Sequence, residues 1–328
     1  MTTATSMATS IDVATKIKVG ISTCLLGRNV RYDGGHQRDA YLVETLGRWF
    51  EYVSVCPEVE MGLSIPRPAL RLIGDVEAPR MVFRESGEDV SDRMARWSKA
   101  RLDLLADLDL CGYVFKSDSP SCGMERVKVH AANGQASRKG RGLFAAALMA
   151  RFPLLPVEEE GRLHDIGIRD NWIERVFAYR RWRDAVEAGL TVGRLVAFHT
   201  AHKFQVLAHD PTRYRALGRL VADAKALPRA QLVTLYGELF VAALTTRATP
   251  GKHANVLQHL VGFVTDALEP ADRAELARLI DDYRKGLVPL VVPLTLLRHH
   301  VRRHPAPYVD GQTYLDPHPR ELLLRNHA

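Results

Sequence analysis

Short apolar runs alternate with helical patterns in the first half of the chain. Continuous apolar stretches predict buried strands, and apolar residues spaced every three or four positions predict helices. The predicted strands are Lys18–Leu26, Tyr52–Val59, Cys111–Ser117 and 154–159. The predicted helices are Arg38–Phe50, Val90–Leu108 (with Ser91 as its N-cap) and Gly140–Pro153. This alternation is typical of a parallel, Rossmann-like α/β sheet, in which ligands bind at the carboxyl ends of the strands.

The second half shows helical patterns without convincing strands. Prolines separate these patterns regularly, at positions 211, 228, 250, 270, 289 and 305. Proline suits the first turn of a helix and breaks its interior, so the second half is predicted to be an all-α helical bundle. The predicted organisation is a flexible lead (1–15), an α/β domain (16–170), a connecting helix (171–190), a helical domain (191–305) and a C-terminal arm (306–328).

Composition places the chain among ordinary folded proteins. Its 328 residues are 46% hydrophobic and 25% charged, which suits two domains with real cores. The N-terminus lacks the basic start and apolar stretch of a secretory signal. The apolar run Leu287–Leu297 is too short and too rich in proline to span a bilayer. We therefore expect a cytoplasmic protein whose four cysteines remain thiols.

The charge is concentrated in the second half. Residues 1–170 carry 23 Lys and Arg against 23 Asp and Glu, whereas residues 171–328 carry 22 against 15. The whole excess of +7 therefore belongs to the helical half, which also holds 10 of the 13 histidines. A basic domain joined to a neutral one favours a polyanionic partner. Arginines that only keep a helical domain soluble are the alternative.

Three cysteines stand where strands of the predicted parallel sheet end. Cys24 and Cys56 end the first two strands, and Cys122 follows the third, with spacings of 32 and 66 residues. Since the carboxyl ends of parallel strands share one edge, we expect the three thiols to converge there. Cys111 begins its strand at the opposite end, so it is interpreted as a buried packing residue.

Converging thiolates in a reducing compartment are typical of metal or cluster ligands. Structural zinc takes four ligands, and His36 could supply the fourth. A [4Fe-4S] cluster held by three cysteines would instead leave one iron open as a soft Lewis acid. Plain buried thiols are the third possibility, and the spacing leaves all three open.

Two neighbouring side chains could add acid–base chemistry. Glu58 follows Cys56 by two residues, which on an extended strand would place both side chains on one side. Ser119 precedes Cys122 by three residues. A carboxylate and a hydroxyl beside a cluster could activate water and donate a proton. A salt bridge for Glu58 and a turn hydrogen bond for Ser119 are the structural alternatives.

The loop after Cys24 combines basic residues with glycine. Its arginines, Arg28, Arg31 and Arg38, could meet phosphate, and its glycines allow close backbone approach. The segment matches neither common phosphate-loop pattern, so it could equally be a well-made turn. Predicted substrate-binding residues are Arg28, Arg31, Asp33, Gly34 and Gly35.

The motifs STCLLGRNVRYDGGHQRD, CPEVEMGLSIPRPALRL and KSDSPSCG resemble the thiouracil desulfidase family over about residues 16–169. The resemblance implies a [4Fe-4S] cluster held by Cys24, Cys56 and Cys122. It also implies a catalytic Glu58 and Ser119. The reaction implied is non-redox: the thiocarbonyl sulfur binds the open iron, water replaces it at carbon, and hydrosulfide leaves.

The second half resembles a companion domain of unknown function, most distinctly over Leu195–Tyr214. There His199, His202 and Lys203 fall on nearly one helix face. A metal site and a polar structural face are both possible interpretations, and no acidic partner is spaced to complete a metal site.

Together these features predict a desulfidase that converts 4-thiouridine in tRNA to uridine, with the basic half holding the polymer. Because that base is stacked in folded tRNA, it must be exposed or flipped out. Salvage of free thiouracil or thionucleotides, with the bundle serving dimerisation, is one alternative. A cluster-based DNA-binding sensor and a zinc-stabilised RNA-binding module are the others. The predicted tRNA-binding residues are Lys203, Arg298, Arg302 and Arg303.

Overall fold

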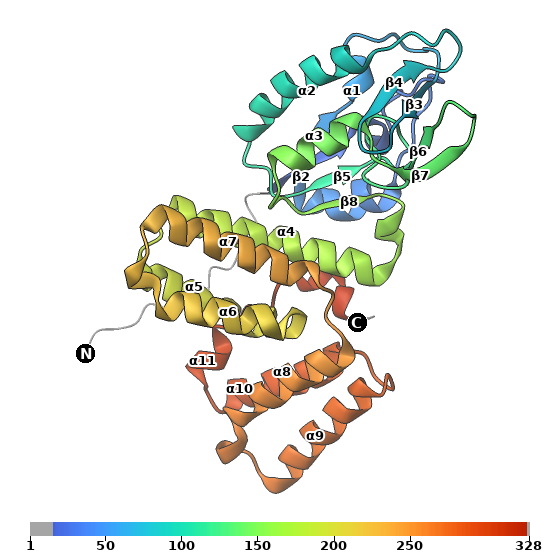
Figure 1. Ribbon diagram of the computed structural model, residues 1–328. Helices are drawn as coiled ribbons and strands as arrows, with labels where there is room; N and C mark the ends of the chain where they lie inside the picture. Colours follow the sequence, from blue (N-terminus) through green and yellow to red (C-terminus); the bar gives the residue numbers. More distant parts are fainter. Residues whose placement is uncertain (1–15, 327–328) are drawn as a thin grey trace. The chain divides into compact units, whose positions relative to one another are not determined.

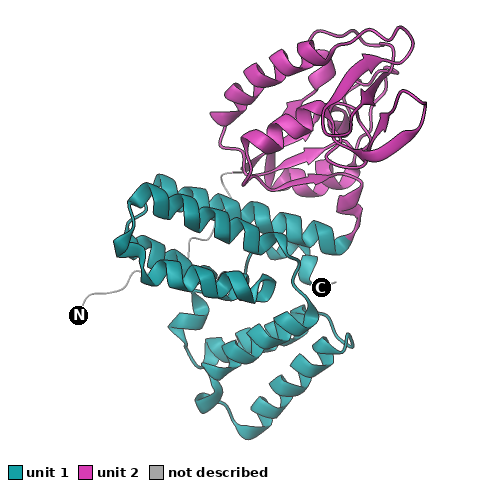
Figure 2. Ribbon diagram, in the orientation of Figure 1, with its two compact units in different colours: residues 1–12, 166–328 teal, residues 13–165 magenta. Residues whose placement is uncertain are grey.

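The computed structural model describes residues 16–326. It contains two compact units, which meet in sequence between Asp165 and Ile166 (Figure 2). The predicted flexible lead, residues 1–15, lies outside the described residues. No helix in the described part of the chain is long and apolar enough to cross a membrane.

A four-stranded parallel sheet forms the centre of the N-terminal unit. Its strands are β1 (Ile17–Ser22), β2 (Phe50–Val55), β5 (Tyr113–Phe115) and β8 (Val157–Glu159), in the order β2-β1-β5-β8. Every neighbouring pair is parallel, as predicted. β1 and β5 approach closely because Gly20 leaves room for the buried ring of Tyr113. A Cβ at position 20 would lie 2.1 Å from that ring.

The helices of this unit follow the predicted pattern in part. Helices α2 (Ser91–Ala106) and α3 (Leu143–Arg151) lie side by side (Figure 1). The helix predicted over Arg38–Phe50 is instead a π-helical turn, Tyr41–Thr45, followed by a 3₁₀ turn, Leu46–Arg48. Ser91 was predicted as the N-cap of α2, but Val90 takes that position. The Ser91 hydroxyl instead accepts the amide of Met81 at 2.7 Å.

A second four-stranded sheet was not predicted. It comprises β3 (Leu70–Gly74), β4 (Pro79–Phe83), β6 (Val127–His130) and β7 (Ala136–Gly140), in the order β4-β3-β6-β7. β3 and β6 are parallel, and the outer pairs are antiparallel. These strands are short and carry charged residues on one face, so their sequence lacks the continuous apolar run of the central strands.

The C-terminal unit is helical, which confirms the predicted all-α half. Pro211, Pro250, Pro270 and Pro307 stand in the first turns of helices, and Pro228 is an N-cap. The main helices are α4 (Ile166–Glu187), α5 (Val192–His209), α6 (Pro211–Ala222), α7 (Arg229–Thr245), α8 (Pro250–Gly262), α9 (Pro270–Arg284) and α10 (Val291–Arg303).

Aromatic packing joins α4, α5 and α7. The Trp182 indole stacks on Tyr236 with ring centroids 5.1 Å apart, and Phe198 contacts both rings edge-on. The C-terminal segment, which includes the short helix α11 (Pro307–Asp310), returns to α5. There the amide of Thr313 donates to the carbonyl of Ala201 at 2.9 Å.

The histidines on α5 belong to this core. His202 is buried, with Nδ1 2.8 Å from the Phe198 carbonyl and Nε2 accepting from Arg181. His199 Nδ1 lies 3.2 Å from the Tyr236 hydroxyl. Burial lowers the pKa of His199 to about 4 and that of His202 well below its usual value. Both are therefore neutral, hydrogen-bonded core residues, in keeping with the structural interpretation of this face.

Acid is expected to destabilise the helical unit. Burial also lowers the pKa of His253 to about 3, so three histidines stay neutral when folded. The unfolded chain protonates them near their ordinary pKa of about 6.5, so it binds more protons as the pH falls. The free energy of unfolding should therefore decrease from about pH 6.5 toward pH 4. Hydrogen exchange of α5, α7 and α8 at pH 7 and pH 5, corrected for intrinsic rates, measures this.

One buried pair works partly in the opposite direction. Burial would lower the pKa of His209, but the Glu174 carboxylate 3.4 Å away raises it. A raised pKa contributes stability that is fully present below the unfolded pKa of about 6.5 and is lost as the pH rises through the folded pKa, so His209 opposes the change only above about pH 6.5. Glu174, whose pKa is lowered by His209 despite burial, loses its contribution only below about pH 4.3. Equal protection at pH 7 and pH 5 would contradict the prediction.

Candidate active site

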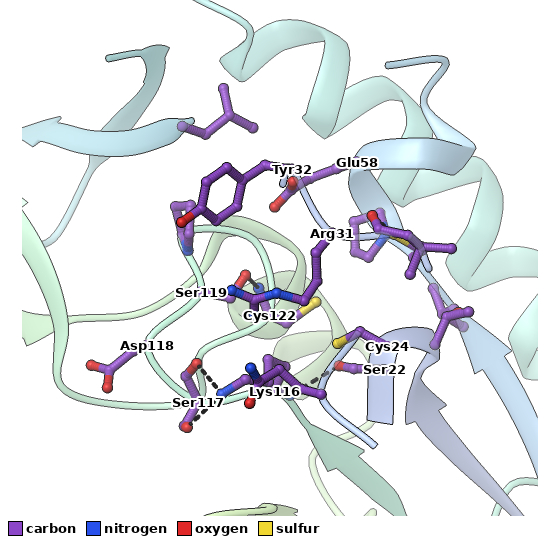
Figure 3. Close-up of a pocket in the computed structure, with 18 of the residues that line it drawn as sticks. Ser22, Cys24, Arg31, Tyr32, Glu58, Lys116, Ser117, Asp118, Ser119 and Cys122 are labelled. Atoms are coloured by element: carbon purple, nitrogen blue, oxygen red, sulfur yellow. Dashed lines mark hydrogen bonds between the residues drawn. The ribbon is translucent and has the colours of Figure 1, made fainter. Parts of the chain in front are cut away.

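A cavity of about 470 Å³ opens at the carboxyl ends of β1, β2 and β5 (Figure 3). Six predicted site residues line it: Cys24, Cys56, Cys122, Glu58, Ser119 and Arg31. Other charged or hydroxyl-bearing residues around it, which the sequence analysis did not single out, are Ser22, Thr23, Tyr32, Arg67, Lys116, Ser117 and Asp118. The topology therefore brings the three predicted thiols to one edge of the parallel sheet.

Cys24 and Cys56 lie just beyond their strands. β1 ends at Ser22, and Cys24 sits in the 3₁₀ turn Thr23–Leu26. β2 ends at Val55, and Cys56 is the N-cap of the short helix α1 (Pro57–Glu60). The predicted strands ran through both cysteines. They end earlier because the chain turns into helical conformation at the edge of the sheet.

Cys122 lies in a loop that is held by hydrogen bonds between its own residues. The Ser119 hydroxyl accepts the amides of Ser121 and Cys122 at 3.2 and 3.1 Å, and the Gly123 amide donates to the Ser119 carbonyl. This is the turn hydrogen bond considered from the sequence. Because both acceptor positions of the hydroxyl are filled, Ser119 can act toward a ligand only through its proton.

The same loop is tied to the N-terminus of α3. The amides of Leu143 and Phe144 donate to the carbonyls of Pro120 and Ser121, which satisfies donors that a helix start leaves open. Gly142 permits this contact, since a Cβ there would lie 2.5 Å from the Ser121 carbonyl. The position of Cys122 is therefore fixed by backbone contacts with α3.

The three thiols influence one another electrostatically. Burial raises the pKa of each, to about 11 for Cys24, and Cys24 and Cys56 raise the pKa of Cys122 further. Lys116 and Arg31 act in the opposite direction on Cys24. Figure 3 shows the sulfurs of Cys24 and Cys122 at the same part of the cavity. A positively charged ligand would convert these thiols to thiolates.

Glu58 is held by two partners that the sequence analysis missed. Its Oε2 accepts from Arg67 Nε at 2.8 Å, and its Oε1 accepts from the Ser121 hydroxyl at 2.7 Å. The Arg67 side chain is only 3% exposed. The argument from strand alternation was wrong, because Glu58 lies in the first turn of α1. The salt bridge that the sequence left open is present and orients the carboxylate toward the Cys122 loop.

A second, partly buried ion pair, also missed, lies beside Cys24. Lys116 Nζ contacts the Glu160 carboxylate at 2.5 Å and the Ser117 hydroxyl at 3.0 Å. The Ser117 amide and hydroxyl donate to the same carboxylate. Lys116 follows β5 and Glu160 follows β8, so both stand at the edge where the thiols converge. Polar residues directly after buried strands were the signal that could have found them.

The glycine-containing loop forms a turn. The Gly34 amide donates to the Arg31 carbonyl, and the Asp33 carboxylate accepts the Gly35 amide at 3.0 Å. That hydrogen bond lowers the pKa of Asp33. Of the predicted substrate-binding residues, only Arg31 lines the cavity. Those outside its lining are Arg28, Asp33, Gly34 and Gly35.

The predicted tRNA-binding residues occupy different settings in the helical unit. Arg302 and Arg303 are exposed in the last turn of α10. Arg298 is mostly buried and pairs with Asp316 at 2.8 Å. Lys203 Nζ lies 4.6 Å from the centre of the Tyr308 ring. Arg302 and Arg303 are therefore the best placed of the four to meet a polymer.

The thiols are not arranged around a single metal ion. Across residues 16–326, no group of three Cys, His, Asp or Glu side chains is placed to hold one ion. His36, the possible zinc ligand, is exposed and does not line the cavity. A cluster in which each thiolate binds its own iron needs no such group.

Comparison with protein families matches residues 19–160 to 2-thiouracil desulfurase. The N-terminal unit belongs to the 2-thiouracil desulfurase family. The activity that names this family breaks a carbon–sulfur bond. Residues 203–319, in the helical unit, match a family of unknown function, DUF1722.

Individual relatives cover only part of the chain. "Uncharacterized protein YbgA" of Escherichia coli (strain K12) is 35% identical over 158 residues, 48% of this chain and 94% of that protein. "Uncharacterized protein YbbK" of Bacillus subtilis (strain 168) is 29% identical over 136 residues, 39% of this chain and 87% of that protein. The solved structure of the [4Fe-4S]-dependent thiouracil desulfidase TudS is 32% identical. The match covers 46% of this chain and 95% of the TudS chain, with a TM-score of 0.36.

Proposed function

We propose that this protein is a [4Fe-4S]-dependent, non-redox desulfidase that converts 4-thiouridine in tRNA to uridine. The observation that carries the proposal is the convergence of Cys24, Cys56 and Cys122 with Glu58 and Ser119 in one cavity of a 2-thiouracil desulfurase domain. In the reaction the carbon–sulfur bond breaks, a carbon–oxygen bond from water forms, and hydrosulfide and a proton are released. No electrons are exchanged, so no redox partner is required.

The cavity fits an iron–sulfur cluster. Cys24, Cys56 and Cys122 would hold it, since all three line the cavity. Lys116 and Arg31, which lower the pKa of Cys24, also line the cavity, and each is paired with a carboxylate, Glu160 and Asp33 respectively. When bound, the cluster would supply a soft Lewis acid that polarises the thiocarbonyl group of the substrate.

Glu58 and Ser119 supply the proton chemistry. Arg67 and Ser121 hold the Glu58 carboxylate, which is proposed to take a proton from the attacking water. The Ser119 proton is the only part of its hydroxyl left for a substrate, so Ser119 is proposed to donate to the pyrimidine edge. The backbone contacts of its loop fix both groups before the substrate arrives.

The helical unit supports tRNA as the substrate. It carries the whole excess of +7, whereas residues 1–170 are neutral. Lys and Arg contacts to phosphate supply sequence-independent affinity for a polymer, which a small thiolated base would not need. A tRNA substrate also implies that the protein works in the cytoplasm, where we propose it is located.

The direct test follows the near-ultraviolet band of 4-thiouridine. Anaerobically purified protein with its cluster confirmed by absorbance is incubated with bulk tRNA, and with 4-thiouridine monophosphate in parallel. Loss of the band from tRNA with release of hydrosulfide is the expected result. Turnover of the monophosphate alone would make the protein a salvage enzyme. No turnover of either would favour the sensor.

Charge reversal on α10 should weaken tRNA turnover selectively. In Arg302→Glu/Arg303→Glu we expect kcat/KM for tRNA to fall about tenfold or more. Its dependence on salt should also weaken by about one unit of log–log slope per lost phosphate contact. 4-Thiouracil turnover should be unchanged. Arg96→Glu/Lys99→Glu on α2, exposed and equal in charge change, is the control. Equal losses on both substrates would contradict this division of labour.

A further inference from the structure

Three aromatic rings surround Lys203 in the helical unit. Lys203 Nζ lies 4.6 Å from the centre of the Tyr308 ring and 5.2 Å from that of Phe204. The centre of the Phe263 ring lies 4.9 Å from that of Tyr308 and 6.3 Å from that of Phe204. Lys203 and Phe204 belong to α5, Phe263 is the C-cap of α8, and Tyr308 lies in α11. We call these four residues the aromatic–lysine cluster.

Phe263 is the outermost ring of this cluster. Phe204 is buried and Tyr308 is half-buried, whereas Phe263 is 49% exposed. Tyr308 packs against the Phe263 ring at an angle of 32°, as a neighbour in a tilted stack does. The remaining surface of the ring is open to a further planar group, and nucleobases stack on such rings.

An exposed ring is exceptional in this part of the chain. Among the described residues of the helical unit, the other exposed large apolar side chains are aliphatic, namely Ile166, Val196, Leu287 and Leu323. Single exposed aliphatic residues are normal on a protein surface and need no explanation. A phenylalanine that continues a stack of rings outward, beside a lysine, is a more specific arrangement.

Lys203 stands in this cluster without an acidic partner. Within residues 16–326 no carboxylate forms an ion pair with its ammonium group, and burial lowers its pKa with no acid to oppose the effect. A partly desolvated cation is destabilised unless an anion approaches, and contact with ring faces offsets only part of this penalty. The position therefore suits a negatively charged group that arrives together with a planar one.

The charge around the cluster favours nucleic acid as its occupant. The helical half carries the whole excess of +7. His259, exposed on α8, adds another possible donor, with its ring centre 6.4 Å from that of Phe204. Each nucleotide offers a flat base and a phosphate in a fixed order, and proteins bind unpaired strands with aromatic rings beside basic residues.

We propose that the aromatic–lysine cluster binds an unpaired nucleotide of tRNA, with its base stacked on Phe263 and a neighbouring phosphate at Lys203. This inference rests on the proposed function and deepens it: the helical unit recognises an unpaired base in addition to phosphate charge. RNA presents such bases in loops and at its ends, whereas the bases of a duplex are stacked on one another.

The test removes the ring and keeps an apolar side chain. In Phe263→Leu, Kd for an in vitro transcribed tRNA, measured by fluorescence anisotropy, should rise about 5- to 100-fold, the effect of losing one stacked base. Phe263→Tyr keeps a ring and should bind within about twofold of wild type. The matched control is Leu287→Ala, because Leu287 is 69% exposed in the same unit. Full affinity in Phe263→Leu, or an equal loss in Phe263→Tyr or in the control, would overturn the inference.

Salt dependence and RNA structure provide a second check. A base stack releases no counterions, so the log–log slope of Kd against salt should be the same in wild type and Phe263→Leu. Lys203→Gln should reduce that slope by about one, and an unchanged slope would contradict a phosphate at Lys203. A blunt RNA duplex has no unpaired base, so Phe263→Leu should bind it like wild type. Equal weakening for duplex and tRNA would contradict recognition of an unpaired base.

Binding of the transcript, which carries no thiolated base, separates this inference from the proposed function. If bulk tRNA keeps its 4-thiouridine but Phe263→Leu weakens binding, the stacking site stands and the desulfidase proposal fails. If tRNA is desulfidated and wild type and Phe263→Leu bind the transcript alike, the stacking site fails. Light scattering tests a second copy of this chain as the occupant: loss of self-association in Phe263→Leu with intact RNA binding would also overturn the inference.

Discussion

Replacing Cys122 by alanine is expected to abolish desulfidation. The thiol lines the cavity together with Cys24 and Cys56, and the loop around it is fixed by Ser119 and α3. Without it the cluster would keep two of its three proposed protein ligands. We expect iron and acid-labile sulfide per chain to drop sharply, and 4-thiouridine loss from tRNA to fall to background. The folded sheet should remain, since the loop is held by backbone contacts.

Cys111 provides the matched control. It is also fully buried and belongs to the same strand region, but it precedes β5 and lies outside the cavity lining. Cys111→Ala should keep its iron content and turnover, at a stability cost on the order of 1 kcal/mol. Full iron content and activity in Cys122→Ala would refute its role as a ligand. Equal iron loss in both variants would show a general effect of disturbing this core.

Glu58→Gln should reduce kcat about 10²- to 10⁴-fold while iron content stays unchanged. Glutamine can keep a hydrogen bond from Ser121, but it cannot take a proton from water. The measurement is single-turnover desulfidation of a small thiolated substrate, so that tRNA binding does not enter. Loss of iron together with activity would assign Glu58 to the structure of the site instead.

A double variant separates catalysis from charge balance. Glu58→Gln alone leaves the nearly buried Arg67 without its carboxylate, and breaking such a pair costs about 3–5 kcal/mol. Glu58→Gln/Arg67→Gln removes both charges and should recover part of that stability in urea unfolding. If the carboxylate is the base, activity stays low in the double variant. Recovery of activity would assign the defect of the single variant to the unpaired guanidinium.

Much of the fold could be predicted because its signals are local. Buried parallel strands appear as continuous apolar runs, and proline marks helix starts directly, as at Pro211, Pro250 and Pro270. The second sheet could not be predicted in this way. Its strands bury one face only, and although β3–β4 and β6–β7 are local hairpins, β3 pairs with β6 across a long sequence distance. Such pairings depend on contacts that no local pattern encodes.

The candidate site, like the fold, could be predicted only in part. Convergence of the thiols follows from parallel topology alone, so Cys24, Cys56 and Cys122 could be placed together. Arg67 and Ser121 could not be found, because their importance lies in hydrogen bonds to Glu58, which is distant from Ser121 in sequence. Substrate binding by Arg28 and Gly34 stays a prediction, because a turn and a ligand loop use the same residues.

The wide spacing of the three thiols has a consequence for biosynthesis. Compact metal motifs gather their ligands within a few residues, so they can bind metal in a short nascent segment. Here the ligands follow three different strands, and β5 pairs with β1 across about ninety residues of chain. The central sheet must therefore assemble before a cofactor can find all three thiols. Cofactor insertion is consequently a late step, and the protein made without iron is expected to be folded rather than unstructured.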